Sequence, residues 1–128
     1  MNADELVSRY RAGERDFGGA FLAGANLCGV DLSGIMLRQA DLRFANLREA
    51  NLTDADLSEA DLYEANLRGT VLRNANLTSA ILWLAGPLDA HLEGANLQDA
   101  RIASGQLSRA ASLAGAIMPD GTRHESER

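Results

Sequence analysis

The 128-residue sequence predicts an all-β solenoid, a rod of very short strands and turns that stacks coil upon coil. Every fifth position from 17 to 107 is apolar, a small residue stands two positions before most of these centres, and Asn or Asp usually stands directly before them. The centres are Phe17, Leu22, Leu27, Leu32, Leu37, Leu42, Leu47, Leu52, Leu57, Leu62, Leu67, Leu72, Leu77, Leu82, Pro87, Leu92, Leu97, Ile102 and Leu107. A helix repeats its faces every 3.6 residues and a strand every 2, so neither can bury a period of five. A chain that turns a corner every five residues can bury it, because every centre then points inward.

Composition and charge limit the classes of function. The chain carries 12 basic and 18 acidic residues, a formal net charge of −6 that gives no support to nucleic-acid binding. No apolar run approaches the roughly 20 residues of a membrane-spanning helix, and the charged start MNADELVSRYRAGERD lacks the apolar block of a signal peptide. We therefore expect a cytoplasmic protein that does not enter a membrane.

Catalytic and metal-binding residues are scarce. Cys28 has no second cysteine to pair with, and His91 and His124 are too few and too far apart in sequence to complete a zinc site with it. No set of nucleophile, base and orienting group can be assembled from the usual residue types. An interior filled with leucine and alanine leaves no room for a small-molecule substrate. We expect no enzyme, no metal and no cofactor.

The N-terminal segment predicts a cap for the first coil. Residues 4–12 fit a short amphipathic helix, with Asp4 as its N-cap and Gly13 after its last turn. The apolar side chains on one face of this helix are Leu6, Val7 and Tyr10. Open solenoid ends expose unpaired strand edges, so we expect the helix to cover one of them.

The repeated triplets carry a family resemblance. Ala-Asn-Leu occurs at 25–27, 45–47, 65–67, 75–77 and 95–97, and Ala-Asp-Leu at 40–42, 55–57 and 60–62. With these runs the sequence resembles the pentapeptide-repeat proteins, and its two ends resemble those of small single-domain members of the cyanobacterial type. The resemblance implies a right-handed quadrilateral parallel β-helix with four repeats, or twenty residues, per coil. Most such members have no established activity.

Three segments follow from this reading. Residues 1–14 form the N-terminal capping helix, residues 15–117 the pentapeptide-repeat β-helix, and residues 118–128 a solvated C-terminal tail. Near the C-terminal end the repeat loses its Asn or Asp, and Leu113 stands one position past the register. The pattern does not say how this end is capped.

Charged residues alternate along the rod. Six acids and no arginine lie between positions 49 and 64, as a girdle between two arginine belts. The acids are Glu49, Asp54, Asp56, Glu59, Asp61 and Glu64, and the arginines are Arg38, Arg43, Arg48, Arg68 and Arg73. Some pentapeptide-repeat proteins resemble duplex DNA in shape and charge and bind gyrase, which requires a continuous negative face. Because the belts interrupt that face, binding of a topoisomerase by DNA mimicry is the alternative hypothesis rather than the first.

Two stacked polar columns have structural interpretations. The amides of Asn26, Asn46 and Asn66 can hydrogen-bond along one side of the rod. The carboxylates of Asp41 and Asp61 stack on the next side, where they could hold a cation or be relieved by Arg43.

An outward apolar cluster is the strongest candidate for a functional site. Twenty-residue stacking places Trp83 above Tyr63, with Phe44 close by, on positions that should face water. The residues expected on this surface are Phe44, Tyr63, Ile81, Trp83, Leu84 and Leu88. The alternatives are that the C-terminal segment covers the cluster, or that Pro87 forces a bulge that buries Leu84 or Leu88. We predict a non-catalytic module that binds another protein, or a second copy of itself, through this surface.

Overall fold

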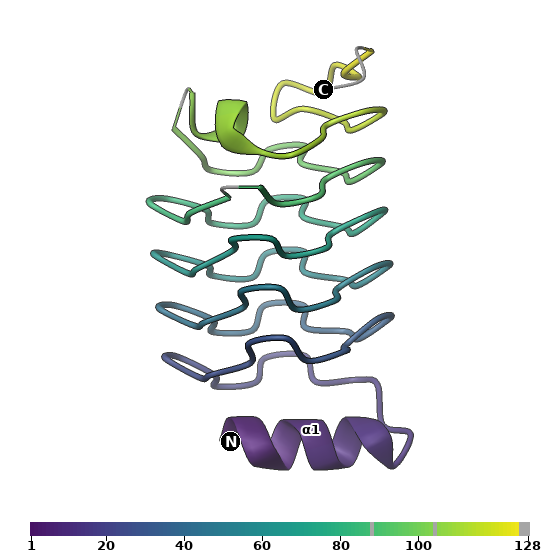
Figure 1. Ribbon diagram of the computed structural model, residues 1–128, viewed down its shortest axis with the longest axis vertical. Helices are drawn as coiled ribbons and strands as arrows, with labels where there is room; N and C mark the ends of the chain where they lie inside the picture. The colour runs from purple at the N-terminus through teal and green to yellow at the C-terminus, as the bar shows by residue number, and fades with distance from the viewer. Residues whose placement is uncertain (88, 104, 126–128) are drawn as a thin grey trace.

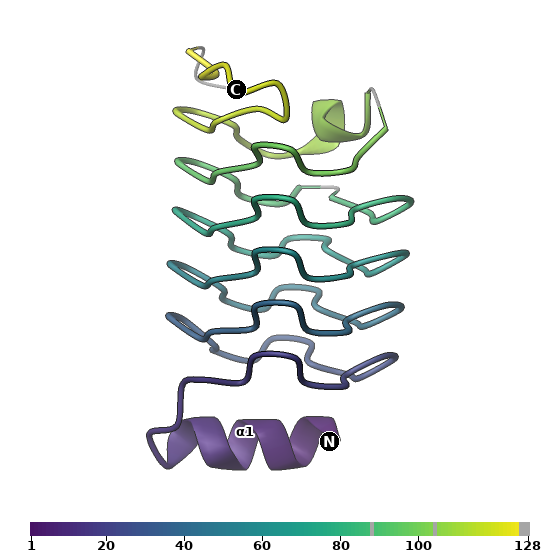
Figure 2. The ribbon, with the colours of Figure 1, turned by 180° about the vertical axis from the view of Figure 1, so that it is seen from behind.

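The fold is a rod of stacked coils, seen in a computed structural model that describes residues 1–87, 89–103 and 105–125. Helix α1 (Ala3–Arg11) lies across one end, and the C-terminus lies at the other (Figures 1 and 2). Single bridged residues, rather than extended strands, join the coils in parallel. The bridges connect residues twenty apart, as between Asp41 and Asp61, so four repeats complete one coil.

Each repeat turns its corner through two local features. The side chain before the centre accepts a hydrogen bond from the backbone N–H two residues on, as when Asn66 Oδ1 accepts from Arg68 N at 3.0 Å. The residue two positions after the centre has a positive φ, 70° at Gly24 for example. Asn and Asp therefore act mainly as turn formers. A contact along the amide column occurs between Asn46 Nδ2 and Asn26 Oδ1, at 3.4 Å.

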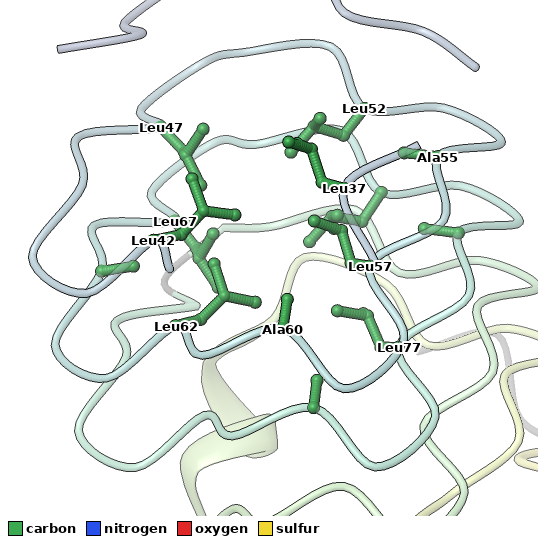
Figure 3. Close-up of a cluster of buried hydrophobic side chains, with 14 of the residues drawn as sticks. Leu37, Leu42, Leu47, Leu52, Ala55, Leu57, Ala60, Leu62, Leu67 and Leu77 are labelled. Carbon is green, nitrogen blue, oxygen red and sulfur yellow. The ribbon is translucent and has the colours of Figure 1, made fainter. Parts of the chain in front are cut away.

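The core is a stack of leucines with alanines beside them, as Figure 3 shows around Leu57 and Ala60. Leu57 is 1% exposed and Ala60 is fully buried. The interior contains a void of only about 10 Å³ near Pro87, where proline takes the place of a leucine. This volume is close to that of a single water probe, so the core cannot hold a substrate.

Helix α1 closes the N-terminal end. Leu6 is fully buried against the first coils, and Tyr10 donates a hydrogen bond from its hydroxyl to Ser33 O at 2.6 Å. The N-cap is Asn2, so the prediction of Asp4 was wrong. Asn2 has an extended backbone and accepts from Glu5 N at 2.8 Å, whereas Asp4 lies in the first turn, where its charge favours the helix dipole.

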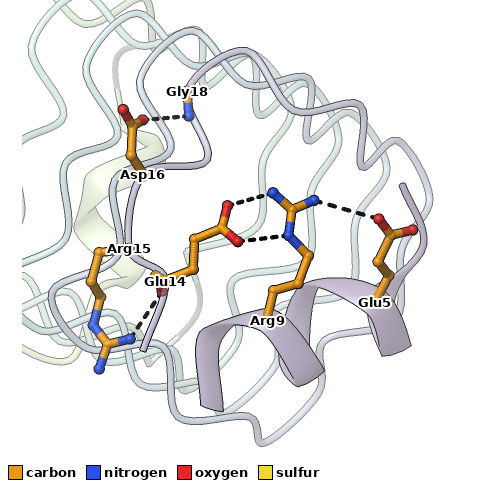
Figure 4. A network of polar contacts seen from close by, with 6 residues as sticks. All are labelled: Glu5, Arg9, Glu14, Arg15, Asp16 and Gly18. Carbon is orange, nitrogen blue, oxygen red and sulfur yellow. Dashed lines mark hydrogen bonds and ion pairs between the residues drawn. The ribbon is translucent and has the colours of Figure 1, made fainter. Parts of the chain in front are cut away.

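Polar contacts join α1 to the segment that leads into the first coil (Figure 4). Arg9 Nε donates to Glu14 Oε1 at 2.8 Å, and its guanidinium also reaches Glu5 on the same helix. Arg15 Nη1 donates to Glu14 O at 3.0 Å. Glu14 is therefore contacted by Arg9 from the helix and by Arg15 from the first coil.

One additional residue interrupts the stack near the C-terminal end. The bridge from His91 reaches Ser112, an offset of twenty-one, and Leu113 becomes the buried centre of the repeat that follows. This confirms the shifted register of Leu113. The 3-10 helix η1 (Gln106–Arg109) replaces the regular repeat at this level.

The side chain of Gln106 replaces the backbone donor that Ala85 O would have in a regular coil, and it adds a second donor to Leu82 O. Its Nε2 donates to Leu82 O at 3.1 Å and to Ala85 O at 3.0 Å, while its Oε1 accepts from Ala103 N at 2.7 Å. At regular centres the backbone N–H donates to the next coil, as Leu67 N does to Gly86 O. Pro87 has no N–H to donate. The proline is accommodated because η1 replaces the regular coil above it, so no regular partner is left without a donor there.

The last described residues fold back over the final coil. Ile117 and Arg123 form an antiparallel bridge, and His124 N donates to Ala116 O at 2.7 Å. Most of residues 118–125 are exposed, as expected of a tail, but they are hydrogen-bonded to the rod. In the part of the chain that the structure describes, no helix is long and apolar enough to cross a membrane.

Candidate interaction surface

One side of the rod carries the aromatic side chains that the sequence predicts to face outward. We call Phe44, Tyr63, Trp83 and Leu84 the apolar strip. Tyr63 and Trp83 follow one another in a single column, and Phe44 and Leu84 lie two coils apart in the adjacent column. The rings of Phe44 and Tyr63 meet edge to face, with centroids 5.7 Å apart. The strip therefore spans three successive coils on one side of the rod.

The strip is open to solvent. Phe44 is 53% exposed, Trp83 43% and Leu84 64%, whereas Tyr63 and Ile81 are partly buried. The predicted site residue Leu88 lies outside the described residues. The described part of the C-terminal segment stacks on the end of the rod and leaves these side chains uncovered. Burial of Leu84 by a bulge at Pro87 is likewise not found, since Pro87 occupies its centre and Leu84 points outward.

The backbone of the strip is unusual for bulky residues. Phe44 has a φ of 61° and Leu84 a φ of 57°, in a column that begins with Gly24 and continues through Glu64. A left-handed backbone costs an L-residue about 1 to 2 kcal/mol relative to a right-handed one, and glycine avoids most of this. Because both side chains remain more than half exposed, their own burial does little to offset it.

The charges beside the strip are only partly neutralised. Arg43 forms a double contact with Asp41, from Nε to Oδ1 at 2.9 Å and from Nη2 to Oδ2 at 2.7 Å. This hydrogen-bonded pair lowers the pKa of Asp41. Arg43 Nε is also 4.0 Å from Asp61 Oδ2, so an arginine already relieves the two stacked carboxylates. Among the described residues, no group of three or more acidic, His or Cys side chains could hold a metal ion.

Glu64, which lies beside the strip, has no ion-pair partner of this kind among the described residues. It lies between Phe44 and Leu84 in their column and is exposed. The described residues provide no ion pair for its carboxylate. The strip therefore presents a negative charge framed by apolar side chains.

The acidic girdle and the arginine belts are connected on one side only. Arg38 Nη2 reaches up to Glu59 Oε1 at 3.6 Å, as the belt arrangement predicts. Arg73 contacts Glu93, at 3.0 Å, instead of a girdle acid, because Glu93 stands directly above it in the same column. The girdle lies between the two belts as predicted, but Arg73 of the upper belt does not pair with it.

One exposed aromatic residue on this side of the rod was not predicted from the sequence. Phe21 is 75% exposed and bridges to Asp41, which places it on the same side as the strip, one coil below Phe44. It stands where the repeat normally has Asn or Asp, and that substitution was the available signal. Met36, 41% exposed, occupies the equivalent position on a neighbouring side.

An open hollow adjoins the upper end of the strip. It has a volume of about 370 Å³ and lies where η1 leaves the regular stack. Its lining includes Leu84, Pro87, Gln106 and Arg109. Leu84 therefore belongs both to the strip and to the edge of this hollow.

Comparison with known proteins establishes the family. Residues 14–43 and 45–83, more than half of the chain, match the family model described as pentapeptide repeats, in eight copies. The chain belongs to the pentapeptide-repeat proteins. Among curated proteins, none matches this sequence.

Several solved structures are similar to it. A pentapeptide repeat protein from Nostoc Pcc 7120 is 44% identical, with 79% of each chain covered and a TM-score of 0.52. One from the thylakoid lumen of Arabidopsis thaliana is 34% identical, covering 67% of this chain and 63% of that one, with a TM-score of 0.43. HetL, involved in heterocyst differentiation regulation in Nostoc sp. Strain PCC 7120, is 25% identical, covering 97% of this chain and 100% of HetL, with a TM-score of 0.42. The last two superpositions are too loose for a comparison of sites.

Proposed function

We propose that the chain is a right-handed, four-sided β-helix that acts as a non-catalytic protein-binding module, with the apolar strip as its contact surface. Pentapeptide-repeat proteins are generally structural or interaction modules, and no catalytic family is indicated. The observation that carries the proposal is the exposure of Phe44, Trp83 and Leu84 together on one side of the full chain. Contiguous apolar patches on a folded monomer usually mark binding sites.

The chemistry of the strip suits a protein partner. Aromatic residues are enriched at the centres of protein interfaces, where they bury a large area at a small entropic cost. Tyr63 stands on the middle coil of the strip and Trp83 beside Leu84 at its upper end, and the paired Asp41 and Arg43 provide a polar border. The partner is another protein or a second copy of the chain, and we place the interaction in the cytoplasm without nucleic acid, membrane or small-molecule substrate.

Affinity capture with matched variants tests this proposal. The immobilised full-length chain, the Trp83→Glu variant and the Gln98→Glu variant are each exposed to an extract of the source organism, and retained proteins are identified by mass spectrometry. Gln98 is exposed and lies outside the strip, so its variant makes the same charge change elsewhere. Sedimentation velocity on the same three proteins tests for a second copy.

We expect one partner, or self-association, that is present with the wild-type chain and with Gln98→Glu and lost with Trp83→Glu. Thermal unfolding should show both variants within about 0.5 kcal/mol of the wild type, as is usual for surface changes. The proposal fails if the three proteins retain the same partners and have the same mass in solution.

A further inference from the structure

We infer that the element bound by the apolar strip is an α-helix that lies along the rod axis, with apolar side chains at positions i and i+7 and a Lys or Arg between them. This inference rests on the proposed function and specifies the partner's chemistry. It is drawn from the column that contains Phe44, Glu64 and Leu84.

The spacing of this column favours a helix. Phe44 N donates to Tyr63 O at 2.9 Å and Glu64 N donates to Trp83 O at 3.0 Å, so successive coils are paired as neighbouring strands are. Neighbouring strands lie about 4.8 Å apart, which puts Phe44 and Leu84 about 10 Å apart with Glu64 midway.

Only one regular element reproduces these intervals. Along an α-helix, position i+7 lies about 10.5 Å from position i, and positions i+3 and i+4 lie about 4.5 to 6 Å from it. Along an extended strand, side chains on one face recur at about 6.7 and 13 Å, which misses both intervals. A helix parallel to the rod can therefore contact Phe44 and Leu84 with two apolar side chains, while a third side chain between them faces Glu64.

The charge pattern specifies that third side chain. Arg43 is held by Asp41, so the nearest cation on this side is already engaged. Glu64 has no ion pair among the described residues and is exposed between two apolar side chains. Covering the strip without a cation would leave a carboxylate desolvated and unpaired, which is costly. A Lys or Arg at i+3 or i+4 of the bound helix supplies the missing partner.

The adjacent column gives the strip the width that a helix needs. Tyr63 stands beside Glu64, and Trp83 stands one coil higher beside Leu84, so an apolar ridge of the helix has a second row to contact. Helices that dock on apolar surfaces contact them with side chains at i, i+3, i+4 and i+7. The two rows of the strip match that pattern.

A second copy of the chain fits this surface less well. Antiparallel pairing that brings Phe44 opposite Leu84 of the other copy also brings Glu64 opposite its own counterpart. Two like charges would then be buried face to face, which disfavours association. Self-association is therefore an outcome that would count against the inference.

Selection of peptides from a display library tests the inference that the strip binds a helix. A phage library of helical peptides of eighteen residues, with the exposed positions randomised, is panned on the full-length chain. Phage that also bind the Trp83→Glu variant are removed, so that the remaining peptides depend on the strip. The same library is panned on Glu64→Lys and on the control Gln98→Glu. Selected sequences are synthesised, and their affinities are measured by fluorescence anisotropy and their helicity by circular dichroism.

We expect selected peptides with apolar residues at i and i+7 and Lys or Arg at i+3 or i+4. Panning on Glu64→Lys should change that central residue to Asp or Glu, while Gln98→Glu should return the wild-type pattern. Trp83→Glu should weaken binding of the selected peptides about tenfold or more, because the largest aromatic anchor of the strip is lost.

Three results would overturn the inference. The first is a selected pattern that alternates as in an extended strand, and the second is a central residue that does not respond to Glu64→Lys. The third is a wild-type chain that is dimeric through the strip and loses the dimer in Trp83→Glu, which would leave the protein-binding function standing. If affinity capture finds a partner but the library yields no binder, the inference of a bound helix is wrong and the protein-binding function stands. If neither experiment finds a binder, the inference and the proposed function are both wrong.

Discussion

Within each repeat the position of a residue determines its structural role. The centre fills the core, the Asn or Asp before it holds the turn, and the residue two positions after it takes a left-handed backbone. Gly24 meets the last requirement without strain, whereas Phe44 and Leu84 meet it at a cost. These two residues are therefore unfavourable for folding alone, and a binding role gives a reason for their presence.

Replacing Leu84 by glycine should stabilise the protein. The left-handed backbone at a φ of 57° no longer opposes a bulky side chain, and the greater freedom of glycine in the unfolded chain offsets part of that gain. We expect the free energy of unfolding to rise by about 0.5 to 1 kcal/mol in urea denaturation. Trp83→Gly, one residue earlier and outside the left-handed positions, should instead lower it. An equal loss in both variants would mean that Leu84 is packed rather than strained.

The pair of Asp41 and Arg43 should make stability depend on pH. The hydrogen bonds from Arg43 hold the pKa of Asp41 below its ordinary value of 3.8. A lowered carboxylate pKa adds stability above the ordinary value, and that stability is lost as the pH falls through the lowered one. Because Arg43 is about half exposed, Asp41→Asn should cost only about 0.5 to 1 kcal/mol at pH 7. Urea denaturation should show this difference closing in strong acid, and a difference independent of pH would contradict the role of the ion pair.

At the scale of elements, the two ends of the rod are closed by different devices. Helix α1 packs Leu6 against the first coils, as an amphipathic cap does in other solenoids. The opposite end relies on η1, whose Gln106 supplies side-chain donors to two carbonyls of the coil below. The terminal hairpin that includes Ile117 then lies over the last coil.

Gln106→Glu should weaken the C-terminal end. The variant has nearly the same shape but replaces the amide donor by an oxygen, which leaves Ala85 O without this partner and Leu82 O with its backbone donor Ala85 N alone. A buried acceptor that loses its hydrogen bond costs about 1 to 3 kcal/mol. Urea denaturation should show a loss in this range, against a change of about 0.5 kcal/mol or less for the exposed control Gln98→Glu. A Gln106→Glu variant as stable as that control would contradict the capping role.

The sequence predicts the elements wherever the repeat is regular. Every fifth residue must point inward for the core to form, so the leucine centres, the register shift at Leu113 and the exposure of Trp83 and Leu84 could be read from spacing alone. The cap at α1 could also be predicted from its apolar face, although Asn2 rather than Asp4 begins the helix.

What spacing could not predict depends on a single irregular coil or on a single side chain. Gln106 is an ordinary polar residue in the sequence, and its capping role arises only because the inserted residue turns η1 over the coil below. Phe21 was not predicted because it is the only aromatic residue at the position before a centre, and spacing alone gave it no stacked apolar neighbour. The pairing of Arg73 with Glu93, outside the girdle, could not be predicted from the order of charges along the chain.

Across the whole molecule, charge is distributed in bands rather than along one face. The chain has a net charge of −6, but arginines interrupt its negative surface along the rod. Arg38 contacts Glu59 of the girdle, and Arg43 contacts Asp61. A rod that imitated duplex DNA would present an unbroken negative face. The banding leaves the apolar strip as the surface with the more specific chemistry.

The banded charge predicts no inhibition of gyrase. In a supercoiling assay we expect no effect of the protein at micromolar concentration, because electrostatic attraction to a DNA-binding surface needs a continuous field. Inhibition that decreases steeply with salt and disappears in Glu59→Arg would show that DNA mimicry operates after all.

Hydroxyl-radical footprinting tests the binding surface most directly. The full-length chain is oxidised once in purified form and once in an extract of its source organism, and the oxidation rate of each side chain is measured by mass spectrometry. We predict that Phe44, Tyr63 and Trp83 become protected in the extract, because the strip is covered there. Met36, exposed on a neighbouring side, should keep its rate and serves as the internal control. Equal rates for the strip in both samples, or equal protection of Met36, would contradict a binding surface at the strip.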